Sequence, residues 1–260
     1  MERHRLHVGG AFISYEVSGE GHPVVLVHGL GASGRWWARN VGVLVRHFRV
    51  YVIDLIGFGW SGGQAFALEK ASGYLAKWMD ALAIARASFV GHSMGGYVIA
   101  DLAADHARRV DRLVLVDAAG LPFAPAYPRH VLNLVRSLRY VSPRFVPISL
   151  LDTLRAGPLT VWQGVRQVLA SDLTEKLELV KAPTLVVWGA GDSLIPVETG
   201  ERLSGYLRDG RFVRIEASGH NPMWERPDEF NETVLEFLTS VTVAPGVAPA
   251  GRDVATPGAR

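Results

Sequence analysis

The chain has 260 residues, of which 48% are hydrophobic and 20% are charged, and its formal net charge is +2. This length and composition are ordinary for an enzyme of one globular domain with a large core, and the small net charge argues against a nucleic-acid partner. The chain contains no cysteine, which excludes disulfides, thiolate catalysis and cysteine-based zinc or iron–sulfur sites.

Membrane and targeting signals are not visible in the sequence. No apolar run follows residues 1–5, so no signal peptide is indicated. No stretch approaches the roughly 18 uninterrupted apolar residues that span a bilayer. We therefore expect a cytoplasmic protein without integral membrane association.

Short β-rich runs alternate with amphipathic stretches along the chain. The runs that predict strands cover residues 12–17, 24–28, 49–53, 88–90, 112–116, 184–188 and 211–215. The stretches that predict helices cover residues 36–46, 69–84, 95–106, 197–207 and 227–240. The central runs are nearly continuous Val, Ile and Leu, which is typical of parallel strands buried on both faces. The alternation therefore predicts an α/β fold, with a parallel sheet that is covered by helices on both faces.

Residues 121–171 interrupt this alternation. They contain several prolines between short amphipathic pieces, and their charge is strongly basic. We expect an inserted, mostly helical cap at 121–171, with the α/β core formed by residues 1–120 and 172–240. Residues 241–260 are rich in Pro, Gly, Ala and Val, and we expect them to form a disordered tail. The charged residues of the cap are Arg129, Arg136, Arg139, Arg144, Arg155 and Arg166 against Asp152.

The strongest chemical signal is Ser93 in the sequence Gly-His-Ser-Met-Gly at residues 91–95. It lies between the expected strand 88–90 and the expected helix 95–106. A sharp strand-to-helix turn exposes a serine hydroxyl above the sheet edge, and the helix N-terminus favours negative charge that develops there. The alternative is an ordinary Gly-Ser turn that caps a helix. The strand before it and the helix after it favour a catalytic nucleophile.

A serine hydroxyl needs a base that removes its proton, and His220 has the best setting for that role. It follows the expected strand 211–215, and ligand chemistry collects at the carboxyl ends of strands in open α/β sheets. His28 ends the strand 24–28, where we expect it to shape a loop by hydrogen bonding. His92 precedes the nucleophile, and its side chain is expected to point away from Ser93.

Two aspartates compete as the acid that holds this histidine in the correct tautomer. Asp192 follows the strand 184–188 through a glycine turn, and Asp117 ends the strand 112–116. We favour Asp192, because its glycine turn can direct the carboxylate toward the base. The chain order Ser93, Asp192, His220 is also that of nucleophile-elbow hydrolases.

Backbone N–H groups of Leu30 and Met94 are the candidate donors of an oxyanion hole. Met94 opens the helix after the nucleophile, and Leu30 lies in the sequence His-Gly-Leu-Gly at residues 28–31. This glycine-rich stretch lacks the spacing of phosphate-binding loops, so a nucleotide site is not indicated. Asp54 also ends a strand, but glycines follow it, and we expect it to tie down a loop by side-chain hydrogen bonds.

Four of these features, taken in order, resemble the α/β-hydrolase fold superfamily. They are residues 28–31, the sequence Asp-Leu-Ile-Gly-Phe-Gly-Trp-Ser at 54–61, residues 91–95, and residues 189–192 together with 219–220. The resemblance is to the small, cap-bearing, carboxylesterase-like serine hydrolases of bacteria, and it runs from about residue 12 to about residue 238. It implies an eight-stranded, mostly parallel sheet with the cap after the sixth strand. It implies no metal or organic cofactor.

The resemblance favours a serine hydrolase that cleaves carboxylic esters of short to medium acyl chains through an acyl-enzyme. Relatives that open epoxides or remove halide use an aspartate at the elbow, so Ser93 argues against those reactions. The natural substrate, the acyl length, the stereochemical preference and the oligomeric state are left open. Candidate pocket walls, each more often part of a plain core than of a pocket, are Trp36, Phe58, Phe123, Leu132, Leu138, Ile195 and Met223.

Four alternatives stay open beside ester hydrolysis. The same triad serves C–C bond hydrolases of vinylogous diketones, in which cap arginines would hold the dienoate, although a solvated cap face explains these arginines more simply. Perhydrolase or haloperoxidase-like side activity is compatible with Met94. A non-enzymatic ligand receptor on this fold is the third, and it predicts a decayed triad. The fourth is an interfacial lid in which Leu132, Val135 and Leu138 touch lipid.

Overall fold

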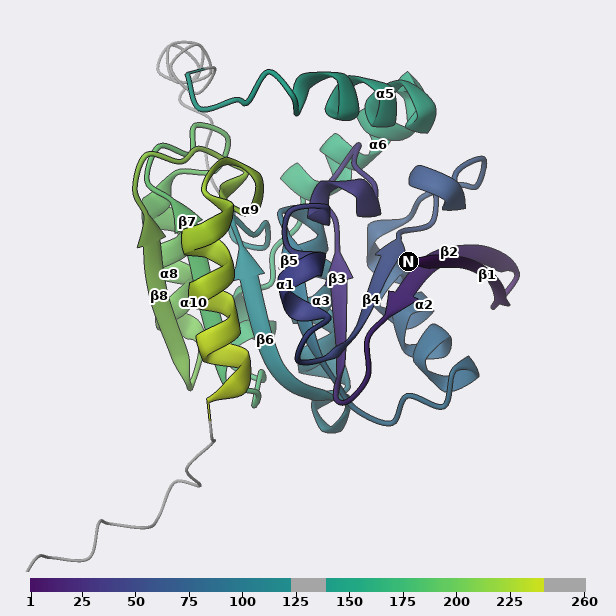
Figure 1. The fold of residues 1–260 in the computed structure, drawn as a ribbon, viewed down its shortest axis with the longest axis horizontal. Coiled ribbons are helices and arrows are strands. Elements are labelled where there is room, and N and C mark those ends of the chain that lie inside the picture. The colour runs from purple at the N-terminus through teal and green to yellow at the C-terminus, as the bar shows by residue number, and fades with distance from the viewer. Residues whose placement is uncertain (123–138, 241–260) are drawn as a thin grey trace, which may run out of the picture.

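An eight-stranded sheet forms the centre of the protein, in a computed structural model that describes residues 1–122 and 139–240 (Figure 1). The strand order is β1-β2-β4-β3-β5-β6-β7-β8. The pairs β1–β2 and β2–β4 are antiparallel and the other pairs are parallel, which confirms the expected eight-stranded, mostly parallel sheet. The strands are β1 (Glu2–Val8), β2 (Ala11–Ser18), β3 (Pro23–Val27), β4 (Arg49–Asp54), β5 (Ala87–His92), β6 (Val110–Val116), β7 (Thr184–Gly189) and β8 (Gly210–Ile215).

Helices cover both faces of this sheet. Neighbouring residues of β3 alternate between two apolar clusters, with Val25 in one and Val24 in the other, as expected for a strand buried on both sides. Side chains of α2, α3 and α8 belong to the first cluster, and those of α1 and α10 belong to the second. These helices are α1 (Val41–Leu44), α2 (Leu68–Ala81), α3 (Met94–Asp105), α8 (Val197–Tyr206) and α10 (Pro227–Thr239).

The first strand, β1, was not predicted from the sequence. It is an edge strand whose residues are mostly exposed, and its sequence Glu-Arg-His-Arg-Leu-His-Val has only a weak apolar alternation. Its partner β2 holds it through pairs from Glu2 with Val17 to Val8 with Ala11. Charged side chains are common on edge strands because they discourage pairing with other chains.

Residues 36–46 do not form the single helix that was expected there. The segment is divided into a 3-10 helix, η1 (Gly34–Trp37), and the short helix α1. Between them, the buried Asn40 side chain donates hydrogen bonds to the Met223 carbonyl at 2.9 Å and to Asn231 Oδ1 at 2.8 Å. These long-range bonds fix the break in the helix, and a helical pattern alone does not show them.

Between β6 and β7 the chain leaves the sheet and forms the helices α5 (Val146–Ala156), α6 (Pro158–Leu169) and α7 (Thr174–Leu177). Figure 1 shows α5 and α6 above the carboxyl ends of the parallel strands. We call residues 139–171 the described cap. Of the cap proposed at 121–171, residues 123–138 lie outside the described residues, as does the tail proposed at 241–260.

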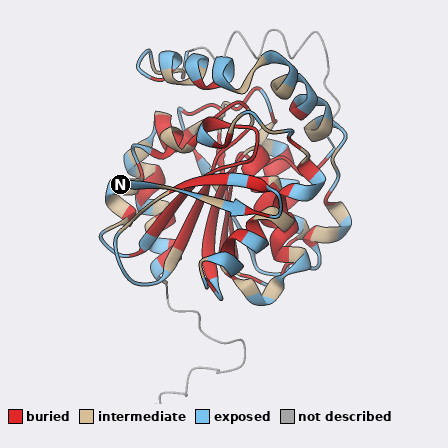
Figure 2. Cartoon of the chain, turned by 90° about the vertical axis from the view of Figure 1, so that its right-hand side faces the viewer, coloured by how far each residue is buried: buried red, intermediate tan, exposed pale blue. Residues whose placement is uncertain are grey.

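The burial pattern separates the cap from the core (Figure 2). The central strands are buried along their length, whereas α5 and α6 carry exposed residues over much of their surface. Across residues 1–122 and 139–240, no helix combines the length and the apolar character needed to cross a bilayer.

Candidate active site

Ser93 lies at a strained turn between β5 and α3. Its backbone φ is 52° and its ψ is −117°, which is a sparsely populated conformation for a residue with a side chain. Three hydrogen bonds hold the turn: the Ser93 N–H donates to the Val116 carbonyl at 2.9 Å, and the Ser93 carbonyl accepts from the N–H groups of Ala119 and Tyr97 at 3.0 and 3.3 Å. The surrounding structure therefore fixes the backbone that carries the hydroxyl.

The two outer glycines of this motif are required by space. A Cβ atom on Gly95 would lie 2.5 Å from the carbonyl oxygens of His28 and Val27. A Cβ atom on Gly91 would lie 2.6 Å from the carbonyl oxygen of Gly95. No larger residue fits between the turn and the neighbouring strand, which explains the Gly-x-Ser-x-Gly spacing in physical terms.

His220 and Asp192 meet at the carboxyl edge of the sheet. His220 Nδ1 lies 2.7 Å from Asp192 Oδ2, and the Asp192 side chain is completely buried. Asp192 Oδ1 accepts hydrogen bonds from the backbone N–H groups of Leu194 and Ile195, at 2.8 and 3.1 Å. Since Nδ1 faces the carboxylate, Nε2 is the ring nitrogen that remains for proton transfer.

The His220 loop lies beside the nucleophile turn. The ring of His92, the residue before Ser93, packs on the His220 ring with centroids 4.9 Å apart, and its Nε2 lies 2.8 Å from the His220 carbonyl oxygen. His92 is therefore used to hold the loop. Burial lowers the pKa of His92 well below its usual value, and the nearby His220 adds to this effect.

Asp117 is a second buried carboxyl group next to this pair. Its Oδ1 accepts a hydrogen bond from the Gly189 N–H at 3.0 Å. One carboxylate oxygen of Asp117, one of Asp192 and one ring nitrogen of His220 all lie within 4.8 Å of one another. Burial and then the charge of Asp192 raise the pKa of Asp117 well above its usual value, which favours a neutral Asp117. Asp192, the favoured residue of the two, is the one that contacts His220 at hydrogen-bond distance.

These three groups are better suited to hydrogen bonding than to holding a metal ion. Both oxygens of Asp192 already accept hydrogen bonds from protein groups, two at Oδ1 and one at Oδ2. Asp117 favours its protonated form, which does not bind metal. The arrangement fits an acid–base pair that needs no cofactor.

Glu225 braces the loop that carries His220, a role that the sequence analysis missed. Its Oε2 accepts hydrogen bonds from the Gly219 N–H at 2.6 Å and from Ser218 Oγ at 2.9 Å. Burial raises the pKa of Glu225. No local motif marks this residue, because its role depends on the short helix α9 (Pro222–Glu225) folding back on the loop.

The loop after β3 passes directly against the nucleophile. A Cβ atom on Gly29 would lie 3.1 Å from Ser93 Cβ. Residues 29–32 form a tight turn, in which the Ala32 N–H donates to the Gly29 carbonyl at 3.4 Å and Gly31 has a φ of 68°. Leu30 follows Gly29 in this turn, and Met94, which follows Ser93, is the first residue of α3. That their N–H groups form an oxyanion hole stays a prediction.

Comparison with known families agrees with this geometry. The family model described as "Alpha/beta hydrolase family" matches residues 24–233. The chain belongs to this family. The match covers the Ser93 turn, the His220 loop and the helices α5 and α6 between them.

Similar proteins of this alpha/beta hydrolase family carry several hydrolytic activities in their names. A 2-hydroxy-6-oxo-6-phenylhexa-2,4-dienoate hydrolase from Comamonas testosteroni is 30% identical, over 87% of this chain and 91% of that protein. A pimeloyl-(acyl-carrier protein) methyl ester esterase from Vibrio cholerae is 27% identical, over 86% of this chain and 97% of that protein. The crystal structure of an enol-lactonase from Burkholderia xenovorans LB400 matches with a TM-score of 0.78 and 29% identity, covering 91% of this chain and all of that one.

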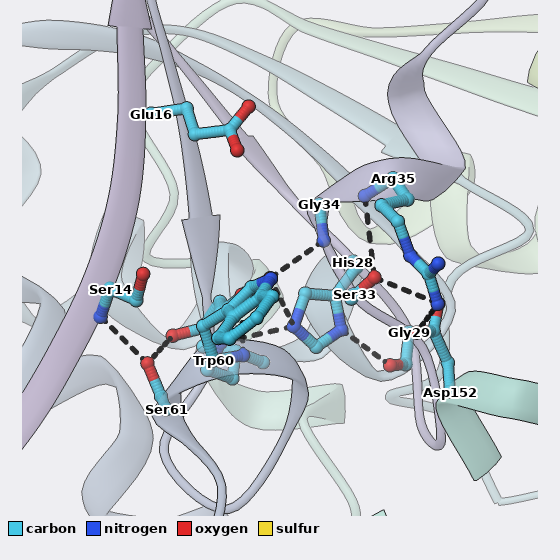
Figure 3. A network of polar contacts seen from close by, with 12 residues as sticks. Ser14, Glu16, His28, Gly29, Ser33, Gly34, Arg35, Trp60, Ser61 and Asp152 are labelled. Atoms are coloured by element: carbon cyan, nitrogen blue, oxygen red, sulfur yellow. Dashed lines mark hydrogen bonds and ion pairs between the residues drawn. The ribbon is translucent and has the colours of Figure 1, made fainter. Parts of the chain in front are cut away.

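His28 shapes the loop that follows β3, as expected (Figure 3). Its Nε2 accepts a hydrogen bond from the Leu55 N–H at 3.0 Å, so Nδ1 carries the proton and donates to the Gly29 carbonyl at 2.7 Å. Burial lowers the pKa of His28, which favours this neutral form.

Asp54 is the second support of the loop. Its Oδ1 accepts from the Gly34 N–H at 2.7 Å, and its Oδ2 accepts from the Trp60 N–H at 2.8 Å. Ser61 Oγ donates to the Asp54 carbonyl at 2.8 Å and accepts from the Ser14 N–H at 2.7 Å. Asp54 thus ties two loops together, in agreement with the structural role expected of it.

The candidate pocket residues fall into three groups. Trp36 joins the described cap to the residue before Ser93: its ring packs on Phe145 at 4.7 Å and on His92 at 5.8 Å. Phe58 and Met223 are completely buried in the two core clusters, and Ile195 is nearly so, which favours the plain core role left open for them. Phe123, Leu132 and Leu138 lie outside the described residues.

The outer surface of the described cap combines arginines with apolar side chains. Three of its four arginines lie over aromatic rings: Arg155 over Trp60 at 4.5 Å, Arg166 over Trp162 at 4.9 Å and Arg139 over Tyr140 at 4.5 Å. Most of the exposed cap side chains are apolar. The large ones on α5 and α6 are Val146, Leu150, Leu151, Leu154, Leu159, Trp162, Val165 and Leu169.

Proposed function

We propose that this protein is a serine esterase that hydrolyses carboxylic esters of short to medium acyl chains through an acyl-enzyme. The observation that carries the proposal is the pairing of His220 with Asp192 at 2.7 Å, next to the strained turn that presents Ser93. This geometry supports Ser93 as the nucleophile, His220 as the base and Asp192 as the group that orients the base. The ester-cleaving relatives named above support the same reaction type.

In the proposed first step, Ser93 Oγ attacks the ester carbonyl carbon while His220 Nε2 takes the hydroxyl proton. The carbonyl oxygen becomes an oxyanion, which the N–H groups of Leu30 and Met94 stabilise. The tetrahedral intermediate collapses as the bond to the alcohol oxygen breaks, and His220 gives its proton to that oxygen. The alcohol leaves, and the acyl group stays on Ser93.

In the second step, His220 takes a proton from water, and the water oxygen attacks the acyl carbon. Collapse of this intermediate breaks the bond to Ser93 Oγ, which regains its proton from His220, and the carboxylic acid leaves. Asp192 stabilises the imidazolium form of His220 in both steps. Because Asp192 Oδ1 is held by two backbone N–H groups, its carboxylate does not need to reorganise during the reaction.

Hydrolysis of a carbon–carbon bond is the second candidate, because the Comamonas testosteroni relative is named as a dienoate hydrolase. That reaction needs a polar group that binds the carboxylate of the dienoate. Three of the four arginines of the described cap lie over aromatic rings, and Arg35 is paired with Asp152, so these groups are engaged elsewhere. The fourth, Arg144, is exposed. We favour esters because most of these candidate cations are already engaged. A small-molecule substrate, no nucleic-acid partner and a cytoplasmic location accompany this proposal.

A panel of p-nitrophenyl esters from acetate to laurate tests the proposal. We expect hydrolysis by the wild type, with a maximum at a short or medium chain, and a fall to near background in Ser93→Ala. Ser171→Ala, which removes a hydroxyl bonded only to the Val168 carbonyl among the described residues, is the matched control and should retain activity. Substantial hydrolysis by Ser93→Ala would overturn the mechanism. If the protein hydrolyses none of the esters but rapidly removes the chromophore of a dienoate substrate, the second candidate is favoured.

A further inference from the structure

The loop at residues 28–35, which carries the Leu30 N–H, is joined to the cap by a buried acidic residue. Asp152 of α5 is completely buried. Its Oδ2 accepts a hydrogen bond from Ser33 Oγ at 2.7 Å, and its Oδ1 forms an ion pair with Arg35 (Figure 3). Residues 117 to 119 positions apart in the sequence thus meet in one polar contact.

Two further contacts join the same loop to the cap. The Thr153 hydroxyl, next to Asp152, donates to the Gly31 carbonyl at 3.4 Å. The Leu30 side chain lies against Gly164 of α6, where an added methyl group would overlap Leu30 Cδ1. Four residues of the loop, Leu30, Gly31, Ser33 and Arg35, therefore contact α5 or α6.

The core holds the loop from its other side. Asp54 binds the Gly34 N–H, and His28 binds the Gly29 carbonyl. Both contacts come from the ends of β3 and β4. The other side of the turn faces the cap, and α5 and α6 hold it there. The position of the Leu30 N–H depends on both sets of contacts.

The placement of Asp152 is opposite to that of its neighbours on α5. Leu150, Leu151 and Leu154 are exposed, whereas the charged Asp152 points inward and is completely buried. Burying a carboxylate is unfavourable unless hydrogen bonds and an opposite charge compensate it, and here Ser33 and Arg35 do so. An apolar residue would fill this position at lower cost, so the carboxylate indicates a role in orienting the loop.

We propose that Asp152 is a positioning residue that holds the 28–35 loop in the conformation that aims the Leu30 N–H at the oxyanion. The proposal rests on the ester hydrolysis proposed above. Loss of one oxyanion donor lowers the rate by about 100- to 1,000-fold, and a misplacement of about 1 Å costs about 100-fold. Since Asp152 acts through the loop, its loss should lower the rate by roughly 10- to 100-fold.

The test compares Asp152→Asn with Gln167→Leu. Gln167 of α6 also joins the cap to the core, since its Oε1 accepts from the Leu68 N–H at 2.6 Å, but it does not touch the 28–35 loop. For Asp152→Asn we expect kcat to fall about 10- to 100-fold, with KM changed less than about three-fold. Affinity for a trifluoromethyl ketone, whose tetrahedral adduct places an oxyanion in the same site, should fall in parallel. Gln167→Leu should change neither value by more than about three-fold.

Several outcomes would overturn the proposal. Unchanged kcat and ketone affinity in Asp152→Asn would show that the contact does not position the loop. Equal losses in Asp152→Asn and Gln167→Leu would show that Asp152 only fastens the cap. If Asp152→Asn does not fold, Ser33→Ala removes the same hydrogen bond from the loop side and is expected to show the same split between kcat and KM.

Failure of the ester proposal is distinguishable from failure of this one. If the wild type hydrolyses no ester, the proposed function is wrong. A fluorophosphonate probe still reacts with an activated Ser93, with loss of fluoride, and the transition state and adduct place a phosphoryl oxygen in the oxyanion hole. Slower labelling of Asp152→Asn than of Gln167→Leu would then support the positioning role, and equal labelling would refute it.

Discussion

Replacing Asp192 by Asn should remove most of the catalysis and leave the fold intact. In the structure, Oδ1 accepts two backbone N–H groups, from Leu194 and Ile195. The asparagine oxygen is expected to keep these two bonds, so its NH2 group must face His220 Nδ1. A donor at this place forces the tautomer in which Nδ1 is unprotonated and Nε2 carries the proton. That tautomer does not accept the proton of Ser93.

The expected loss is about 10,000-fold in kcat, because a base held in the wrong tautomer costs about that factor. This corresponds to about 5.4 kcal/mol in the activation barrier, at about 1.36 kcal/mol for each factor of ten. The assay is the hydrolysis of the best p-nitrophenyl ester, with the melting temperature measured on the same samples. Volume and backbone contacts are unchanged, so the melting temperature should stay within a few degrees.

Asp117→Asn is the matched control for this prediction. The introduced amide retains an oxygen that accepts from the Gly189 N–H and gains an NH2 group that donates toward Asp192, much as a protonated Asp117 does. We expect the activity of this variant to stay within about ten-fold of the wild type. A large loss in Asp117→Asn together with an active Asp192→Asn would refute the reasoning and assign the acid role to Asp117.

Three further predictions concern stability and packing. The raised pKa of Asp117 means that the folded state holds its proton more tightly, so its contribution to stability is full below the ordinary value of 3.8 and is lost as the pH rises through the raised value. The melting temperature of Asp117→Asn minus that of the wild type should therefore rise between pH 4 and pH 8. A difference that stays constant over this range would contradict the prediction. Gly164→Ala should displace Leu30 and lower kcat by at least about ten-fold. Gly205→Ala is the control, because an added methyl group there meets open space and should leave kcat unchanged. Equal kcat values for the two variants would show that α6 does not hold Leu30. Trp37 is completely buried, and Trp37→Ala should lower the free energy of unfolding in urea by about 3–5 kcal/mol. Trp162 is exposed, and Trp162→Ala should lower it by less than about 1 kcal/mol. Similar losses in the two variants would contradict the burial argument.

The parts of the fold that were predictable are those whose signal is local. The strands β3 to β7 are short, mostly apolar runs, and burial on both faces makes such runs rich in Val, Ile and Leu. The Ser93 turn also has a local signal, because its Gly-x-Ser-x-Gly spacing lies within five residues, although Gly95 is required by a contact with the end of β3. Both features can be recognised in the sequence without any knowledge of distant contacts.

The features that were missed depend on contacts with other segments of the chain and not on the pattern of the segment itself. β1 is a strand because β2 pairs with it, and its own residues carry little apolar pattern. Asn40 divides a predicted helix because Met223 and Asn231 receive its hydrogen bonds. Asp152 stood out only as the one acidic residue of a basic cap, and its role becomes visible when Ser33 and Arg35 are seen beside it.

The choice between Asp192 and Asp117 could be made from the local sequence, but the protonation state of Asp117 could not. Both follow neighbouring strands, and the structure places both carboxyl groups near His220. Chain order and the glycine turn favoured Asp192, and the 2.7 Å contact agrees with that choice. The neutral state favoured at Asp117 follows from its complete burial, which the sequence does not reveal.

The positive φ of Ser93 also restricts which nucleophiles this scaffold accepts. At a φ of 52°, a side chain that branches at Cβ clashes with its own backbone, and the hydrogen bonds from Ala119 and Tyr97 and to Val116 leave the turn no room to relax. Threonine, the chemically nearest replacement for serine, is therefore sterically excluded. Cysteine and aspartate, which are unbranched at Cβ, fit the same backbone. A single substitution at this position can thus exchange one reaction class for another more easily than it can preserve the hydroxyl.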